Sequence, residues 1–345
     1  MKIIVDAMGG DNAPRSNVEG ALEAVRELGL EVALVGRGDE ILAVLREMGM
    51  NEPPPGLEIV HTAEVVEMED NPATAFKEKK DSSLTVGLTL VKEGKGDAFV
   101  SAGSTGALLS AATLITKRIR GIRRAALAPK LPIPGGAILI DAGATAECTP
   151  EYLLQFAFMG SYYAEHILGK PEPRVGLLNI GAEESKGTDL QRESYALLKA
   201  ADKEGRIHFV GNIEAREAVL GGVDVIVCDG YSGNIFLKTL EGTALLMAGE
   251  MKKMFKKNPV SKVAAVLVSG GLRDIKKMLD SREIGGTALL GISRPVIKAH
   301  GSSDGYAIKN AIAQAQKFAA SGIVENIAEN MEYMRLKPGK GEGEE

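Results

Sequence analysis

The stretch DVIVCDGYSGNIFLKTL, residues 224–240, predicts a buried strand that passes through a tight turn into a helix. Gly230 and Gly233 lie in the turn, where a missing Cβ lets the backbone approach a ligand closely. The first N–H groups of a helix have no intrahelical partner and stand at the positive end of its dipole. The turn is therefore a candidate anion site, with side chains supplied by Ser232, Asn234 and Lys238.

A partial copy of this pattern, DAFVSAGSTG, occupies residues 97–106. When the two stretches are aligned, Asp97 matches Asp224 before the strand, and Thr105 lies opposite Ser232. The glycines of the two turns also match, Gly103 with Gly230 and Gly106 with Gly233. Two such turns predict two anion-binding loops at the carboxyl edge of one sheet, and they add Ser104 and Thr105 to the candidate contacts. A simpler explanation stays open for each turn, because strand-to-helix turns often carry a glycine and a hydroxyl cap simply in order to fold.

Short apolar strands alternate with helical patterns along most of the chain, as in strands 2–6 and 137–140 and helices 15–28 and 150–168. This alternation predicts a mostly parallel sheet covered on both faces, a three-layer α/β/α sandwich of Rossmann type. We expect one large domain over residues 1–335 and a disordered tail at 336–345. Polar, glycine-bearing turns follow five of the strands, at 9–11, 103–105, 141–145, 179–187 and 229–234.

Composition argues against several classes of protein. A net charge of −5, no tryptophan and only 4% aromatic residues are unlike a nucleic-acid-binding protein. Cys148 and Cys228 lack paired-motif spacing, and the acidic residues show no metal-binding pattern, so we expect neither a disulfide framework nor a metal site. No stretch approaches the roughly 18 apolar residues of a membrane span. We expect a cytoplasmic protein without a signal peptide.

Residues 252–282 differ in character from the rest of the chain. They carry nine basic side chains against two acidic ones, a net charge of +7, and apolar residues interleave at helical spacing. A basic amphipathic stretch can lie on an anionic membrane surface or receive an acidic partner, and a solvated helical arm packed on its own domain would show the same pattern. We expect a protruding helical arm over about residues 250–282.

The chain is rich in anion-binding groups, among them Asn179 and Lys186, but it offers no evident protein nucleophile. His300 is the one histidine in a polar glycine turn, HGSSDG, so a Ser–His–Asp assembly is conceivable. No GxSxG elbow presents the serine, however, and Ser302 fits better as the N-cap of the last helix. The residues suit a reaction in which a substrate such as inorganic phosphate is the nucleophile and the protein stabilises an oxyanion.

Six motifs, in order and spread over nearly the whole chain, resemble the PlsX family of phosphate acyltransferases in bacterial phospholipid synthesis. This resemblance implies transfer of a long-chain acyl group from acyl carrier protein to inorganic phosphate, giving acyl phosphate for phosphatidic acid synthesis, with no cofactor. It implies a fold like phosphotransacetylases and isopropylmalate dehydrogenases, a homodimer, and peripheral membrane association through 252–282. The motifs are VDAMGGDNAP (5–14), SAGSTGALL (101–109), RVGLLNIGAEESKG (174–187), FVGNIEAR (209–216), DGYSGNIFLKTLEG (229–242) and VIKAHGSSD (296–304).

On this basis Lys186 and Asn234 are the predicted catalytic residues, which stabilise phosphate and the tetrahedral oxyanion. The chain departs from the family where Ser104 and Thr145 replace the usual asparagines, which shortens the reach of both side chains. The predicted phosphate- and substrate-binding residues are Asp11, Ser104, Thr105, Asn179, Gly230, Ser232, Gly233, Lys238, His300 and Ser302.

Two alternatives remain from the sequence. A dehydrogenase of similar fold would need a nicotinamide site, and the chain has no GxGxxG motif after its first strand. A non-enzymatic scaffold at a lipid surface, which binds acyl carrier protein through the basic arm, would show no phosphate-dependent turnover.

Overall fold

In the computed structural model, which describes residues 1–334, the strands form two sheets. The larger sheet has seven strands in the order β3-β2-β1-β4-β12-β11-β5, and its first five strands are parallel. The predicted tail, 336–345, lies outside the described residues. The strands of this sheet are β1 (Lys2–Asp6), β2 (Glu31–Gly36), β3 (Leu57–His61), β4 (Ala98–Ser101), β5 (Ala126–Ala128), β11 (Gly286–Leu290) and β12 (Val296–Ala299).

The smaller sheet has five strands within the described residues, in the order β6-β7-β10-β8-β9. Four of them are parallel, and the short β6 is antiparallel to β7. The strands are β6 (Lys130–Leu131), β7 (Ala137–Ile140), β8 (Arg174–Asn179), β9 (His208–Glu214) and β10 (Val225–Val227).

The segment β5–β6 joins the two sheets, and the parallel strands of one sheet run in the opposite direction to those of the other. β5 runs in the same direction as β12, because each is antiparallel to β11, whereas β7 is antiparallel to β6. The two parallel sets of strands therefore run in opposite directions. The prediction that both glycine turns lie at the edge of one sheet was wrong, since one turn follows β4 and the other follows β10.

Helices cover both faces of each sheet, which confirms the predicted three-layer architecture. In the larger sheet, the alternation of Ile3 with Ile4 sends one side chain toward α1 and α13 and the next toward α4 and α5. In the smaller sheet, α6 and α7 cover one face, and α8 and the start of α9 cover the other. These helices are α1 (Arg15–Leu28), α4 (Ser83–Lys92), α5 (Thr105–Ala111), α6 (Pro150–Leu168), α7 (Asp189–Lys203), α8 (Ala215–Val219), α9 (Gly230–Lys256) and α13 (Gly305–Ala320).

The remaining helices are mostly short. A π-helical turn, η1, continues α5 and ends at Thr116, because the next residue, Lys117, has a φ of 71°. Gly322, with φ of 65°, separates α13 from the short α14. These elements are α2 (Gly38–Glu47), α3 (Ala75–Glu78), η1 (Ala112–Thr116), α12 (Ser281–Ile284) and α14 (Ile323–Glu329).

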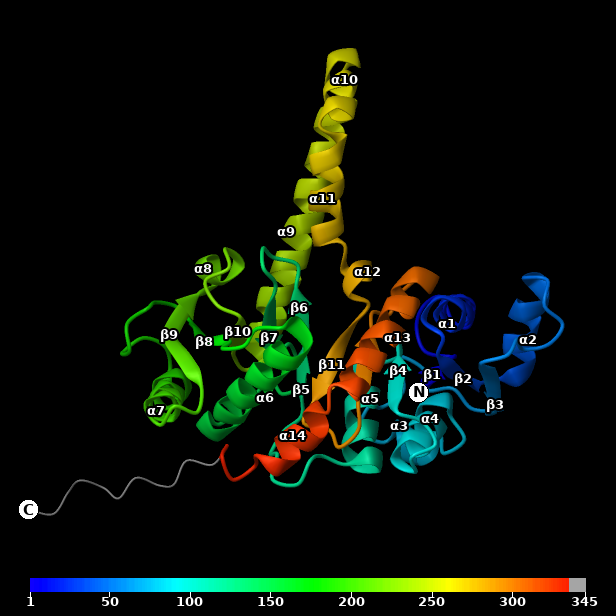
Figure 1. Ribbon diagram of the computed structural model, residues 1–345, viewed down its shortest axis with the longest axis horizontal. Helices are drawn as coiled ribbons and strands as arrows, with labels where there is room; N and C mark the ends of the chain where they lie inside the picture. The colour runs from blue at the N-terminus through cyan, green and yellow to red at the C-terminus, as the bar shows by residue number, and fades with distance from the viewer. Residues whose placement is uncertain (335–345) are drawn as a thin grey trace, which may run out of the picture.

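A helical arm projects from the body of the molecule, as predicted (Figure 1). The long helix α9 leaves the smaller sheet, α10 (Pro259–Leu267) lies at the tip, and α11 (Ser269–Leu279) returns along α9. No residue of α10 or α11 is buried. Among the described residues, no helix is both long enough and apolar enough to cross a membrane.

Candidate active site

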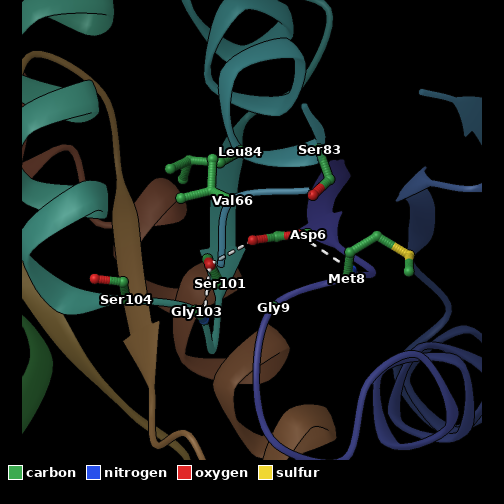
Figure 2. A pocket seen from close by; sticks show the side chains of 9 residues that line it. All are labelled: Asp6, Met8, Gly9, Val66, Ser83, Leu84, Ser101, Gly103 and Ser104. Atoms are coloured by element: carbon green, nitrogen blue, oxygen red, sulfur yellow. Dashed lines mark hydrogen bonds between the residues drawn. The ribbon is translucent and has the colours of Figure 1, made fainter. Parts of the chain in front are cut away.

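The first cluster of polar groups lies where β1 and β4 end in the larger sheet (Figure 2). The Ser101 hydroxyl donates to Asp6 Oδ2 at 2.7 Å, and the Gly103 N–H donates to Ser101 Oγ at 3.1 Å. Gly9 has to be glycine here, because a Cβ would lie 2.6 Å from Asp6 Oδ2 and 2.7 Å from the Gly103 nitrogen. Burial raises the pKa of Asp6 although the Ser83 and Ser101 hydroxyls bond to it. A small pocket opens beside this carboxylate.

Lys298 belongs to the same cluster, and the sequence analysis missed it. It is in register with Ser101 on the neighbouring strand, and its Nζ donates to the carbonyl oxygens of Ala102, at 3.3 Å, and of Ala299. Burial lowers the pKa of Lys298 to about 8, against the attraction of Asp6 and Asp11, and Lys238 of α9 lowers it further by repulsion. The clue in the sequence was a lysine in an otherwise apolar strand, Val296–Ala299.

The loops after β1 and β12 are tied together, and this brings Asp11, His300 and Ser302 close to one another. The Asp11 N–H donates to the Gly301 carbonyl at 2.8 Å, and the Asn12 amide donates to the Ser302 carbonyl at 3.2 Å. His300 Nδ1 lies 2.9 Å from Ser302 Oγ and also accepts the Ser302 N–H. These three predicted residues therefore share one rim of the site.

Asp304, and not the predicted Ser302, caps the last long helix. Its Oδ1 accepts the Ala307 N–H at 2.9 Å, and its Oδ2 accepts from Arg282 at 3.1 Å. Within the described residues, His300 contacts Ser302 and no hydrogen bond joins it to Asp304, so the conceivable Ser–His–Asp assembly does not form. Ser104 does act as a cap, since its Oγ accepts the Ala107 N–H at the start of α5, and Thr105 follows it as an exposed residue.

The second cluster lies in the smaller sheet and is built around the buried Asp141. Its Oδ2 accepts the Thr145 N–H at 2.7 Å, and its Oδ1 accepts the N–H groups of Leu127, Gly143 and Ala144 at 2.9, 3.2 and 3.1 Å. Burial raises the pKa of Asp141 in spite of these four bonds. The carboxylate thus fixes the backbone of the turn 141–145 through these hydrogen bonds.

The start of α9 packs tightly against this turn, and three of its N–H groups already have hydrogen-bond partners. The Gly230 N–H donates to the Thr145 carbonyl at 2.8 Å, and the Ser232 N–H and hydroxyl donate to the Asp229 carboxylate at 2.8 and 2.9 Å. The Gly233 N–H donates to the Asp229 carbonyl at 2.9 Å.

The N–H groups of Gly230, Ser232 and Gly233, at which the sequence predicts an anion site, therefore already have partners within the protein. The two glycines belong to the first turn of the helix and are buried, and the Asp229 carboxylate occupies the cap position that an anion would take. The side chains of Asn234 and of Lys238, which lies one helical turn beyond it, are exposed. Asn234 lies against the turn, because a Cβ on Gly143 would be 2.7 Å from its Nδ2.

Asn179 and Lys186 lie in a third loop, which follows β8 beside β10. Asn179 holds the two ends of this loop together: its Oδ1 accepts the Ile180 N–H at 2.8 Å, and its Nδ2 donates to the Lys186 carbonyl at 3.2 Å. The Lys186 side chain is exposed and packs over Gly181. In this arrangement Asn179 positions the loop, and Lys186 is its exposed cationic group, which forms no ion pair with any residue of 1–334.

Neither cysteine near the second cluster is suited to act as a nucleophile. Burial raises the pKa of the Cys148 thiol to about 12, and burial holds the pKa of Cys228 well above its usual range. Within residues 1–334, no group of three or more His, Cys, Asp or Glu side chains could hold a metal ion. The second cluster therefore offers amides, hydroxyls and a cation, and neither of its thiols is an activated nucleophile.

Comparison with known proteins places the chain among acyl-transferring enzymes. The sequence model of the fatty acid synthesis protein family matches residues 1–326. A phosphate acyltransferase from Alkaliphilus oremlandii is 48% identical over 332 residues, which cover 96% of this chain and 97% of that protein. One from Clostridioides difficile is 47% identical over 329 residues, 95% of each chain. A solved phosphotransacetylase from Streptococcus pyogenes has a similar fold, with a TM-score of 0.59 at 19% identity over 92% of this chain and 94% of that chain.

Proposed function

The chain belongs to the fatty acid synthesis protein family, and on this basis we propose that it is a phosphate acyltransferase that moves a long-chain acyl group from acyl carrier protein to inorganic phosphate. One observation carries the proposal: the first turns of α9 present an exposed amide, Asn234, and an exposed ammonium group, Lys238, while burial raises the pKa of both neighbouring thiols. A site of this kind suits a reaction in which a bound anion performs the attack.

In the proposed reaction, an oxygen of hydrogen phosphate attacks the thioester carbonyl carbon. A C–O bond forms, and the carbonyl electrons move onto the oxygen of a tetrahedral intermediate. When this intermediate collapses, the C–S bond breaks, and the thiolate of the carrier takes up the proton that the phosphate loses. The products are acyl phosphate and free carrier thiol, so atoms and charge balance without a cofactor.

We assign phosphate binding and oxyanion stabilisation to Lys186 and Asn234, with Lys238 one helical turn beyond Asn234. The exposure of all three side chains and the position of Asn234 beside Gly143 support this assignment. The N–H groups of Gly230, Ser232 and Gly233 build the junction beneath these side chains. Asp11, Ser104, Thr105, His300 and Ser302 would line the opposite rim, on the larger sheet, with Asn179 holding the Lys186 loop.

We further propose that the arm attaches the protein to an anionic membrane surface, where its product enters phosphatidic acid synthesis. Apolar side chains are strongly exposed along it, including Leu245 at 75%, Val260 at 79% and Leu267 at 81%. Cations flank them, as interfacial helices require. We propose a cytoplasmic homodimer on the family resemblance alone; light scattering tests the dimer, and flotation with anionic vesicles tests the arm.

The direct test of the function is phosphate-dependent turnover of palmitoyl-acyl carrier protein. Free carrier thiol is followed over time, and acyl phosphate is trapped with hydroxylamine. We expect matching yields of thiol and hydroxamate only when phosphate is present. Lys186→Ala and Asn234→Ala should each lower kcat by about 10²–10³-fold, the usual effect of losing one oxyanion donor, without unfolding the protein. Normal turnover in both variants would refute the assignment of these residues.

A further inference from the structure

Residues 117–124, KRIRGIRR, carry five basic side chains and no acidic one, and we call them the basic segment. Lys117, Arg120, Arg123 and Arg124 are exposed, and Arg118 is partly buried. Throughout the described residues, 1–334, none of these five forms an ion pair with a carboxylate. In a chain of net charge −5, this is a local concentration of positive charge, and Glu151 is a carboxylate whose pKa Arg123 helps to lower.

The basic segment is held in place and is not a loose loop. Ile119 and Ile122 are buried, each only 4% exposed. The Ile119 N–H donates to the Gly291 carbonyl at 2.9 Å, and the Arg123 N–H donates to Gln155 Oε1 at 2.8 Å. The backbone that carries the cations is therefore held in place, so a partner would have to order the cationic side chains but not the backbone beneath them.

The basic segment borders the second cluster of the site. The Arg124 guanidinium lies 5.6 Å from the centre of the Tyr152 ring, in the first turn of α6. That helix begins directly after the loop 141–149, which contains the Asp141 turn. The Arg124 charge also acts on Cys148 in this loop, where it partly opposes the rise of the thiol pKa. A partner seated on the basic segment would therefore sit beside the groups that surround Asn234.

We propose that the basic segment is the docking surface for an acidic face of the carrier protein that delivers the acyl group. This inference rests on the proposed function, which requires a protein-borne thioester to reach the site. The charges are complementary, because arginines that form no ion pair within the described residues can pair with carboxylates of the partner in bidentate geometry. Such rim charges mainly raise the rate of encounter, and salt weakens their effect.

A protein partner fits the basic segment better than a lipid surface does. Both isoleucines within it point into the core, so its exposed surface is cationic without the apolar side chains that insert into a bilayer. The arm has the opposite composition, with exposed leucines and valines beside its lysines. Figure 1 shows the arm projecting from one end of the molecule, whereas α5, from which the chain continues through η1 to the basic segment, lies in the body. Both surfaces could therefore be occupied at once.

The test compares two thioester donors in a charge-reversal variant, Arg120→Glu/Arg123→Glu. Acyl carrier protein presents the thioester on an acidic protein, whereas acyl pantetheine presents the same arm without one. We expect kcat/KM for the carrier-bound donor to fall about tenfold or more at low salt, with the deficit shrinking as salt rises. Turnover of acyl pantetheine should stay unchanged. The matched control, Arg26→Glu/Arg46→Glu, reverses two exposed arginines on α1 and α2 and should leave both donors unaffected.

Three results would overturn the proposal. The first is an unchanged kcat/KM of the charge-reversal variant for the carrier-bound donor. The second is an equal loss of kcat/KM with both donors. The third is a variant that no longer binds anionic vesicles but still docks the carrier protein. Anisotropy of a fluorescently labelled carrier protein measures docking without turnover. If the wild-type protein turns over neither donor, the proposed function fails, and the anisotropy of wild type against the charge-reversal variant still decides whether the basic segment docks the carrier.

Discussion

Replacing Gly233 with alanine should break the junction between α9 and the Asp141 turn. An ideal Cβ at this position would lie 1.9 Å from the Asp141 carbonyl oxygen and 2.7 Å from the Cys228 sulfur. Real Cβ atoms essentially never come closer than 3.0 Å, so the helix and the turn must separate by about 1 Å. The first obstacle is backbone and not the end of a flexible side chain, so a change of rotamer cannot relieve the contact.

Overpacking of this kind usually costs about 1–3 kcal/mol, and a backbone obstacle puts this case near 3 kcal/mol or above. Unfolding entropy is about 2.1 cal/mol/K per residue, or about 0.7 kcal/mol/K for a chain of 345 residues. The expected drop in Tm is therefore about 4 °C. Turnover should also fall, since Asn234 is the next residue and moves with the helix.

Gly242→Ala is the matched control, because it lies on the same helix with nothing within 4 Å of its Cβ. It should stabilise the protein by about 0.5–1 kcal/mol, the usual gain for Gly to Ala in a helix interior. Thermal and urea unfolding followed by circular dichroism measure both variants. A Gly233→Ala variant that melts within a degree of the wild type would refute the tight junction and, with it, the placement of Asn234.

Two further predictions concern the larger sheet. Lys298 has a pKa of about 8 in the folded protein, against an ordinary value of 10.5. Between these two pH values the folded state therefore binds fewer protons than the unfolded state. The free energy of unfolding should then rise with pH, by up to about 1.4 kcal/mol per pH unit. The Lys298→Met variant should lose this contribution to the pH dependence, which urea unfolding at pH 7 to 10 measures. If the free energy of unfolding changed with pH equally in the wild type and the variant, the burial of the ammonium group would be contradicted. Asp304→Ala removes the cap of α13 and should lower the free energy of unfolding by about 1 kcal/mol. Asp304→Asn keeps the hydrogen-bond acceptor and should unfold like the wild type in the same assay. An equal loss of stability in both variants would show that the ion pair with Arg282, and not the cap, stabilises the protein.

Most local elements could be predicted from the sequence because their signals are local. Pro150 at the first position of a helix and Gly169 beyond its end mark α6, and the apolar run before Asp6 marks β1. The division into two sheets could not be predicted in this way. It depends on β5 and β6, of three and two residues, which are too short to show any periodicity and which reverse the strand direction.

The candidate site shows the same limit. Glycine spacing identified the turns correctly, but it could not reveal that Asp229 and Thr145 already engage the N–H groups of α9. Lys298 escaped attention because the sequence was searched for polar turns, whereas this lysine stands inside a strand. Its importance depends on which residues face it from other elements, Asp6, Asp11 and Lys238, and only the fold determines that.

The central claim is that bound phosphate, and not a side chain, attacks the thioester. Its most direct test is intact-protein mass spectrometry during incubation with palmitoyl-acyl carrier protein in phosphate-free buffer, followed by addition of phosphate. The account predicts no mass increase and no release of carrier thiol before phosphate is added, and stoichiometric thiol and acyl phosphate afterwards. An enzyme that gains the mass of one palmitoyl group, with an equal burst of thiol before phosphate is present, would contradict it.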